Sequence, residues 1–163
     1  MLVAVALSVR VQKTVRAPLQ PAWVRGVLQR AATEPAVAAA VARLTEEPDL
    51  TLRIVGSRAM RRLHRAFFDD PAETDVLSFP SGTAGRDGYL GDLAVCWPAV
   101  LRQAARYGHD PGTEAALLSV HGLLHLLGWD HATPPAEAEM TALALAALAR
   151  SGVHPAMGRL PER

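Results

Sequence analysis

The chain has 163 residues, of which 50% are hydrophobic and 20% are charged, and its formal net charge is +1. These values are typical of one soluble globular domain that is long enough to bury a core. Cys96 is the only cysteine, which excludes an intramolecular disulfide, and no uncharged apolar stretch is long enough to cross a bilayer.

Charge is unevenly distributed along the chain. Residues 1–65 contain 11 basic and 4 acidic residues, whereas residues 66–163 contain 6 basic and 12 acidic residues. Arginine, which makes bidentate contacts with phosphate, supplies 16 of the 17 basic residues. A basic half beside an acidic half is compatible with an anionic polymer as partner, although basic residues on amphipathic helices can equally be solvated.

The first expected element is a strand over residues 2–11 (LVAVALSVRV), which is apolar and β-branched and begins to alternate near its end. This segment resembles a signal peptide only superficially. It has no basic residue before its apolar run, and the run is short and ends at Arg10. We therefore expect a buried strand and a cytoplasmic protein.

Helical and strand patterns alternate along the rest of the chain. Apolar residues at helical spacing predict a helix that begins between residues 18 and 21 and ends at about 32, followed by a short helix that ends at 44. Further helices are predicted at 57–67, 98–107, 113–127 and 134–150. Alternating residues predict further strands at 50–55, 74–79 and 89–96, with a glycine-rich loop at 81–88. We expect a single α+β domain over residues 1–163. Its mixed sheet of about four strands is covered by helices, and residues 151–163 form a loosely ordered tail.

The strongest chemical signal is His121-Gly-Leu-Leu-His-Leu-Leu-Gly-Trp-Asp-His131. His121 and His125 are four residues apart and share one face of a helix that is apolar nearly all round, so this helix is expected to be central and buried. Gly128 can end the helix and let the chain return His131 to the same point. Three protein ligands leave one tetrahedral position for water, as in catalytic zinc sites, so we expect one Zn²⁺ held by three histidines plus water.

A zinc ion held by neutral imidazoles remains a strong Lewis acid, which favours hydrolytic chemistry. The histidine spacing matches that of the metzincin proteases, which read HExxHxxGxxH. Gly122 stands where those proteases need a glutamate as general base, so a peptidase is disfavoured. Asp130 either orients a histidine from the outer shell of the site or caps the turn.

Taken together, three ordered segments resemble the YbeY endoribonuclease family. HGLLHLLGWDH is similar to the family pattern HGxLHLxGYDH, and TDVLSFP (74–80) and LGDLAVC (90–96) match family segments upstream, with Glu139-Met140 in the following helix. The resemblance implies a helix-covered, four-stranded mixed sheet and zinc on His121, His125 and His131. It also implies a single-strand-specific, metal-dependent endoribonuclease that matures the 3′ end of small-subunit rRNA and acts in ribosome quality control. The implied partners are rRNA, the small ribosomal subunit and one of its proteins.

The chain departs from the family at one position. Many members have a functionally important arginine six residues before the threonine of the TDVLSF segment, and this chain has Phe68 there. A guanidinium would stabilise charge that develops on the phosphate. Arg61, Arg62 and Arg65 are the candidate substitutes for RNA binding, with Arg65 also a candidate catalytic residue, although all three can be solvated.

Two other functions remain open at this point. A ribosome-assembly factor that binds RNA or protein around a structural zinc predicts a fourth protein ligand, and Phe68 favours this alternative. A metal-dependent peptidase or small-molecule hydrolase predicts an enclosed apolar pocket. Histidine-only sites also accept nickel, copper or iron, so the histidines alone do not select zinc.

Overall fold

The computed structural model describes residues 6–68 and 74–160 of the chain. The strands of this part are β1 (Ser8–Lys13), β2 (Asp49–Val55), β3 (Val76–Pro80) and β4 (Tyr89–Cys96). The helices are α1 (Pro21–Ala31), α2 (Pro35–Leu44), α3 (Ser57–Phe68), α4 (Ala84–Asp87), α5 (Trp97–Tyr107), α6 (Pro111–Leu126) and α7 (Pro134–Ala149).

The four strands form one mixed sheet in the order β1-β2-β4-β3. β1 and β2 run parallel to each other, as do β2 and β4, whereas β3 is antiparallel to β4 and lies at the edge. At Gly91 the register between β2 and β4 shifts, φ is 143°, and a Cβ would overlap the carbonyl oxygen of Phe79. The predicted α+β class and mixed sheet of about four strands are confirmed.

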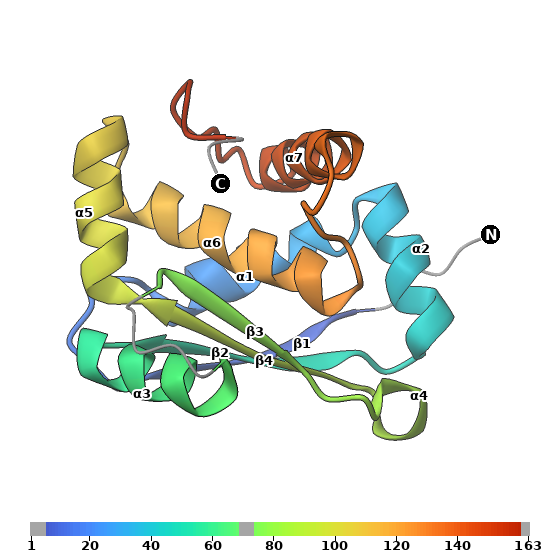
Figure 1. Ribbon diagram of the computed structural model, residues 1–163. Helices are drawn as coiled ribbons and strands as arrows, with labels where there is room; N and C mark the ends of the chain where they lie inside the picture. Colours follow the sequence, from blue (N-terminus) through green and yellow to red (C-terminus); the bar gives the residue numbers. More distant parts are fainter. Residues whose placement is uncertain (1–5, 69–73, 161–163) are drawn as a thin grey trace.

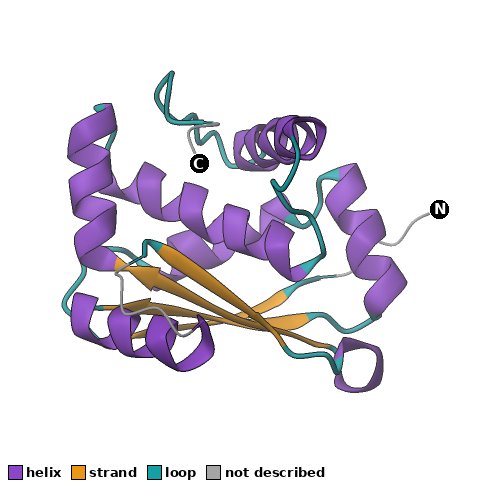
Figure 2. Cartoon of the chain, viewed as in Figure 1, coloured by secondary structure: helices purple, strands orange, loops and turns teal. Residues whose placement is uncertain are grey.

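Helices cover both faces of the sheet. α1 and α6 lie across one face, α7 packs outside them, and α3 lies across the opposite face (Figure 1). Coloured by secondary structure, the strands form a single layer between these helices (Figure 2). Side chains of β3 alternate between the two faces. Val76 packs in the core that α6 shares, whereas Leu77 packs with Met60 of α3.

α6 is the central helix of the fold. Its sequence is apolar nearly all round, and twelve of its sixteen residues are buried between the sheet, α1, α5 and α7. The N-terminus of α6 is capped by Asp110, whose carboxylate accepts the backbone N–H of Thr113 at 2.8 Å. The prediction of a buried central helix carrying the histidine motif is confirmed.

The C-terminal segment differs from the prediction. Residues 151–160 pack against the domain, with Val153 and Arg159 buried, so the prediction of a loosely ordered tail is wrong for these residues. The cause is a buried ion pair, in which the Arg159 guanidinium lies 2.6 Å from a carboxylate oxygen of Glu114 at the start of α6. Residues 161–163 lie outside the described part of the chain.

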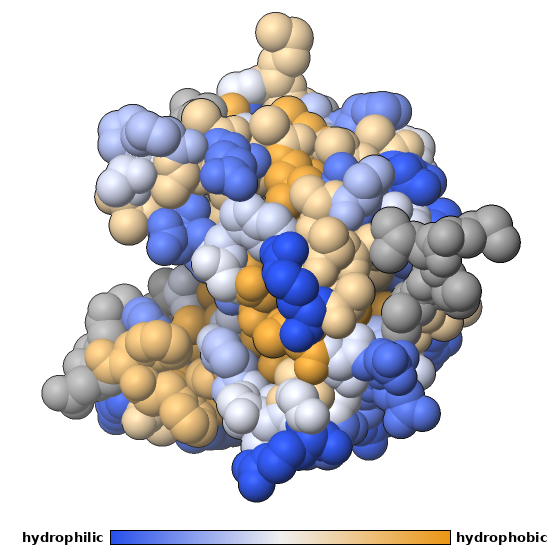
Figure 3. Space-filling model, turned by 90° about the vertical axis from the view of Figure 1, so that its right-hand side faces the viewer, coloured by the Kyte–Doolittle hydropathy of each residue, from blue (hydrophilic) through white to orange (hydrophobic). Residues whose placement is uncertain are grey.

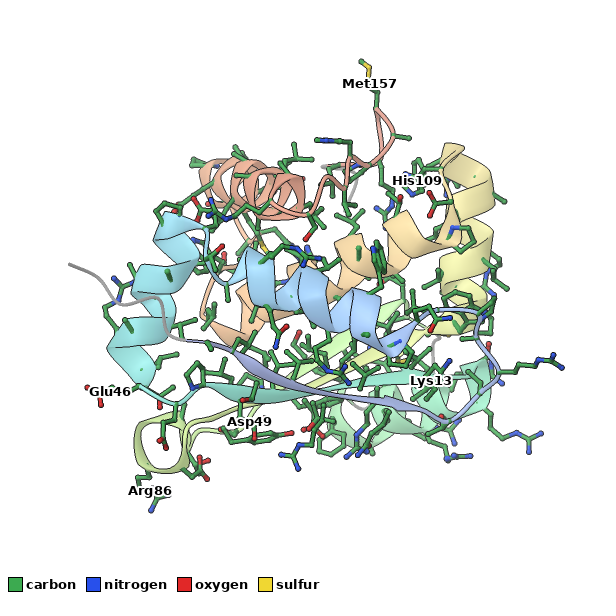
Figure 4. The ribbon with its side chains drawn as sticks, turned by 180° about the vertical axis from the view of Figure 1, so that it is seen from behind. Lys13, Glu46, Asp49, Arg86, His109 and Met157 are labelled. Carbon is green, nitrogen blue, oxygen red and sulfur yellow. The ribbon has the colours of Figure 1, made fainter. Side chains whose placement is uncertain are left out.

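His109 also contributes to this junction, between the end of α5 and the segment that carries Met157 (Figure 4). Its Nδ1 accepts the backbone N–H of Ala156 at 2.9 Å, so the ring proton is on Nε2, which donates to Glu114 at 3.0 Å. The His109 side chain is 8% exposed, so it forms part of the buried junction.

Two element boundaries also differ from the predictions. The first strand is observed at Ser8–Lys13 rather than 2–11, and residues 1–5 lie outside the described part. The glycine-rich loop contains the single turn of helix α4. No helix in the described ranges is long and apolar enough to cross a membrane.

Candidate metal centre

Three histidines converge at the end of α6. His121 and His125 lie on one face of the helix with their Nε2 atoms 3.0 Å apart, and His131 approaches from the segment after the helix. One ring nitrogen from each of the three lies within 4.8 Å of the others. This spacing allows all three imidazoles to bind one ion, as the sequence motif predicted.

The end of α6 brings His131 to this point. Gly128 adopts φ 105°, in the region that favours glycine, and its N–H donates to the carbonyl of His125 at 3.0 Å. The next amide, that of Trp129, donates to the carbonyl of Leu124 at 3.0 Å, which turns the chain back over the helix. The Trp129 indole N–H donates to Glu139 of α7 at 3.3 Å and ties this turn to the last helix.

Burial favours the neutral form of the inner histidines. Desolvation lowers the pKa of His121 from 6.5 to about 3, and the neighbouring His125 and His131 act in the same direction. Desolvation also lowers the pKa of His125, with His131 contributing, while the backbone of Trp129 and the Asp130 carboxylate oppose the shift. Neutral imidazole is the form that binds metal, so this donor set fits a transition-metal ion such as zinc.

Gly122 has a steric reason to be glycine. A Cβ at this position would lie 2.9 Å from Cδ2 of Leu93, 3.3 Å from Oγ of Ser78 and 3.4 Å from Cγ2 of Val76. The Ser78 hydroxyl donates to the Gly122 carbonyl at 3.1 Å, which holds α6 against β3. The second position of the motif therefore faces the sheet, and the glutamate of the protease motif has no room there.

An open pocket surrounds the histidines on the side of β3. The three imidazoles line it together with Val76, Leu77, Ser78 and Pro80 of β3 and with Phe68 of α3. On the face shown in Figure 3, apolar side chains gather at the lower left, below a hollow in the surface.

A smaller pocket lies on the α7 side of His121 and His131. It is lined by Glu137, Met140, Thr141 and Ala144 of α7 and by Leu160 of the C-terminal segment. Glu137 follows His131 by six residues, and no local sequence pattern places its side chain near the histidines. Residues 137, 140, 141 and 144 recur at helical spacing and share one face of α7, which is the sequence signal that could have identified this wall.

The remaining predicted site residues lie farther from the centre of the pocket. Asp130 accepts the backbone N–H of Ala132 at 3.1 Å, which is the turn-capping alternative. Arg61, Arg62 and Arg65 are exposed on α3, and they are not among the described residues that line the open pocket. The structure therefore brings together the three histidines and Phe68 but not the arginines.

Comparisons with known proteins agree with this geometry. A family model described as endoribonuclease YbeY matches residues 10–152. An endoribonuclease YbeY of Chloroflexus aurantiacus is 43% identical over 122 residues, which cover 69% of this chain and 76% of that protein. The Mycolicibacterium smegmatis enzyme of the same name is 44% identical over 105 residues, which cover 58% of this chain and 59% of that protein.

A solution structure of a Thermotoga maritima protein has the same fold, with a TM-score of 0.58 and 18% identity, and the match covers 88% of each chain. The match to the family model begins within β1 and includes β2, β3, β4, the motif helix α6 and the turn that carries His131. The chain therefore belongs to the YbeY endoribonuclease family.

Proposed function

We propose that this protein is a metal-dependent endoribonuclease that cleaves single-stranded RNA and matures the 3′ end of small-subunit rRNA. The proposal rests on three converging imidazoles in an open pocket, in a chain of the YbeY endoribonuclease family. Endoribonuclease activity and rRNA maturation are the properties of that family. The specific rRNA end and the preference for single strands are inferred for this chain.

The resident ion is proposed to be Zn²⁺, one per chain, held by His121, His125 and His131 with water in the fourth position. No carboxylate joins the three histidines as a ligand among the described residues, which is the pattern of a catalytic rather than a structural zinc site. When bound, such an ion supplies Lewis acidity that stabilises negative charge developing on a phosphodiester.

The chain's own residues shape the reaction in three ways. Burial lowers the pKa of His121 to about 3 and also lowers the pKa of His125, so these two imidazoles are held in the neutral form that binds the ion. Ser78 fixes α6 against β3 through the Gly122 carbonyl, which positions His121. Asp130 caps the turn that presents His131. We assign Asp130 this positioning role.

RNA is proposed to reach the pocket past α3. This helix carries Arg61, Arg62 and Arg65 on its exposed surface and ends at Phe68, which lines the pocket. The arginines would attract the phosphate backbone by charge. Arg65 is the nearest of the three in sequence to Phe68 and is our candidate for phosphate contact during cleavage. The small ribosomal subunit and one of its proteins are proposed partners, and the cytoplasm is the proposed location.

The test is cleavage of a defined precursor of the small-subunit rRNA 3′ end by the metal-replete protein. His121→Ala should lose both bound metal and cleavage, whereas His154→Ala, which alters an exposed histidine away from the motif, should retain both. Cleavage by the metal-free His121→Ala protein would refute the mechanism. If the metal-replete wild type and His154→Ala both bound the precursor without cleaving it, the ribosome-assembly alternative would be favoured.

A further inference from the structure

A cluster of aromatic rings lies where α3 ends beside β3. The Phe67 and Phe79 ring centroids are 4.8 Å apart, those of Phe68 and Phe79 are 6.3 Å apart, and those of His64 and Phe68 are 5.5 Å apart. We call these four residues the aromatic platform. Phe67 is 65% exposed and Phe68 is 53% exposed, so two phenylalanine rings of the platform face solvent.

Core packing accounts for only part of this cluster. Phe79 is partly buried and packs against the small core between α3 and the sheet, which also contains Met60 and Leu77. Phe79 thus gives the platform a fixed base. Exposing Phe67 and Phe68 gives up the free energy that their burial would contribute, and an exposed group of large apolar side chains commonly marks a binding surface.

The platform is continuous with the metal centre. Phe68 lines the open pocket together with His121, His125 and His131, and the rings of Phe67 and Phe79 extend the same surface away from it. A ligand that entered the pocket from this side would therefore contact Phe68 next to the histidines.

The charge beside the platform favours a polyanion as that ligand. α3 reads SRAMRRLHRAFF, with four arginines and no acidic residue. Arg61 and Arg65 precede Phe68 by seven and three residues, so the three residues lie on one face of the helix. Apolar rings flanked by guanidinium groups match a single-stranded nucleic acid, whose bases stack on aromatic rings while its phosphates are attracted to basic side chains.

We propose that the aromatic platform is a base-stacking subsite, in which Phe68 stacks an unpaired base of the RNA and thereby holds the adjoining phosphodiester over the three histidines. This inference rests on the proposed function and adds a substrate-positioning residue to it. Stacking at Phe68 selects against base-paired RNA, because a paired base cannot leave its helix to reach the ring. It tolerates any base and favours purines, whose rings offer the larger stacking surface.

Binding of fluorescent single-stranded oligoadenylate to the metal-free protein in chelator measures the subsite without cleavage. Phe68→Ala should weaken binding by about 5- to 150-fold, the range expected for the loss of one base–aromatic stack. Phe68→Trp should retain or tighten it. Leu145→Ala, which truncates a side chain that is 43% exposed on α7, is the matched control and should bind as the wild type does. Thermal unfolding of each variant checks that the fold is intact.

A set of oligonucleotides that each contain one abasic site locates the stacked base. One abasic position should weaken binding to the wild type strongly and binding to Phe68→Ala little, because the contact is already missing in the variant. Equal affinities of wild type and Phe68→Ala would overturn the inference, as would an equal loss at every abasic position. RNA binding that depends on Phe68 without any metal-dependent cleavage would leave the subsite standing and refute the proposed function. Metal-dependent cleavage that does not change when Phe68 is replaced would overturn the subsite and leave the proposed function standing.

Discussion

Replacing Gly122 by alanine tests the close packing that joins α6, the helix that carries His121 and His125, to the sheet. Gly122 lies within α6, where alanine is ordinarily favoured over glycine by about 1 kcal/mol in the free energy of unfolding. In this helix the added Cβ would lie 2.9 Å from Cδ2 of Leu93, a buried side chain of β4, and 3.3 Å from Oγ of Ser78. Such overpacking costs about 1–3 kcal/mol. Gly122→Ala should therefore lower the free energy of unfolding by about 0–2 kcal/mol instead of raising it.

The same displacement should weaken metal binding. If α6 moves away from β3, the hydrogen bond from Ser78 to the Gly122 carbonyl lengthens and His121, the preceding residue, moves with the helix. Urea unfolding of the metal-free protein measures the stability change, and competition with a chromophoric chelator measures the metal affinity.

Gly26→Ala in α1 is the matched control. There the three atoms nearest to the added Cβ all belong to the Arg30 guanidinium, the nearest at 3.0 Å. This group is the end of a flexible side chain whose exposed hydrogen bond to Ser151 can adjust by a few tenths of an ångström. The control should gain up to about 1 kcal/mol of stability and leave metal affinity unchanged. If Gly122→Ala were stabilised as much as Gly26→Ala and bound metal equally well, the packing argument would be refuted.

Three further changes test other parts of the account. The pKa of His121 is lowered to about 3 from 6.5, so the unfolded chain takes up a proton that the native protein excludes. As the pH falls below 6.5, the free energy of unfolding of the metal-free wild type should therefore decrease by up to about 1.4 kcal/mol per pH unit relative to that of His121→Gln. Parallel pH profiles of urea unfolding for the two proteins would contradict this. Arg159→Met leaves the buried Glu114 carboxylate without its guanidinium and should lower the free energy of unfolding by about 3–5 kcal/mol, as measured by thermal or urea unfolding. A decrease of less than about 1 kcal/mol would show that the ion pair does not hold the C-terminal segment. Phe68→Arg exchanges a stacking ring for a positive charge, so the slope of the logarithm of RNA affinity against the logarithm of salt concentration should become steeper by about 0.7. An unchanged slope would place residue 68 away from the phosphates.

The sequence was sufficient for the parts of the protein that local patterns encode. Histidines four residues apart on an apolar helix, followed by Gly128, predicted the convergence of His121, His125 and His131, because helix geometry and the left-handed glycine fix where the side chains point. The hairpin of β3 and β4 followed from two alternating segments joined by a glycine-rich loop.

Contacts between distant segments were not predictable in this way. Arg159 and Glu114 are 45 residues apart, and nothing in a local pattern pairs them, so the C-terminal segment was wrongly expected to be loosely ordered. Glu137 comes close to the histidines only because α7 folds back over α6. The fit of Gly122 against β3 and β4 likewise depends on how helix and sheet pack. From the sequence alone, Gly122 indicates only that the glutamate general base of the metzincin proteases is missing.

The central claim is that RNA cleavage depends on one metal ion held by the three histidines. Its most direct test is to strip the protein of metal, restore zinc stepwise, and follow cleavage of a single-stranded RNA together with bound metal by mass spectrometry. The account predicts that cleavage by the wild type rises until one ion is bound per chain, and that His125→Ala binds no ion at this site and does not cleave. Full cleavage by the metal-free wild type, or by His125→Ala without bound metal, would contradict it.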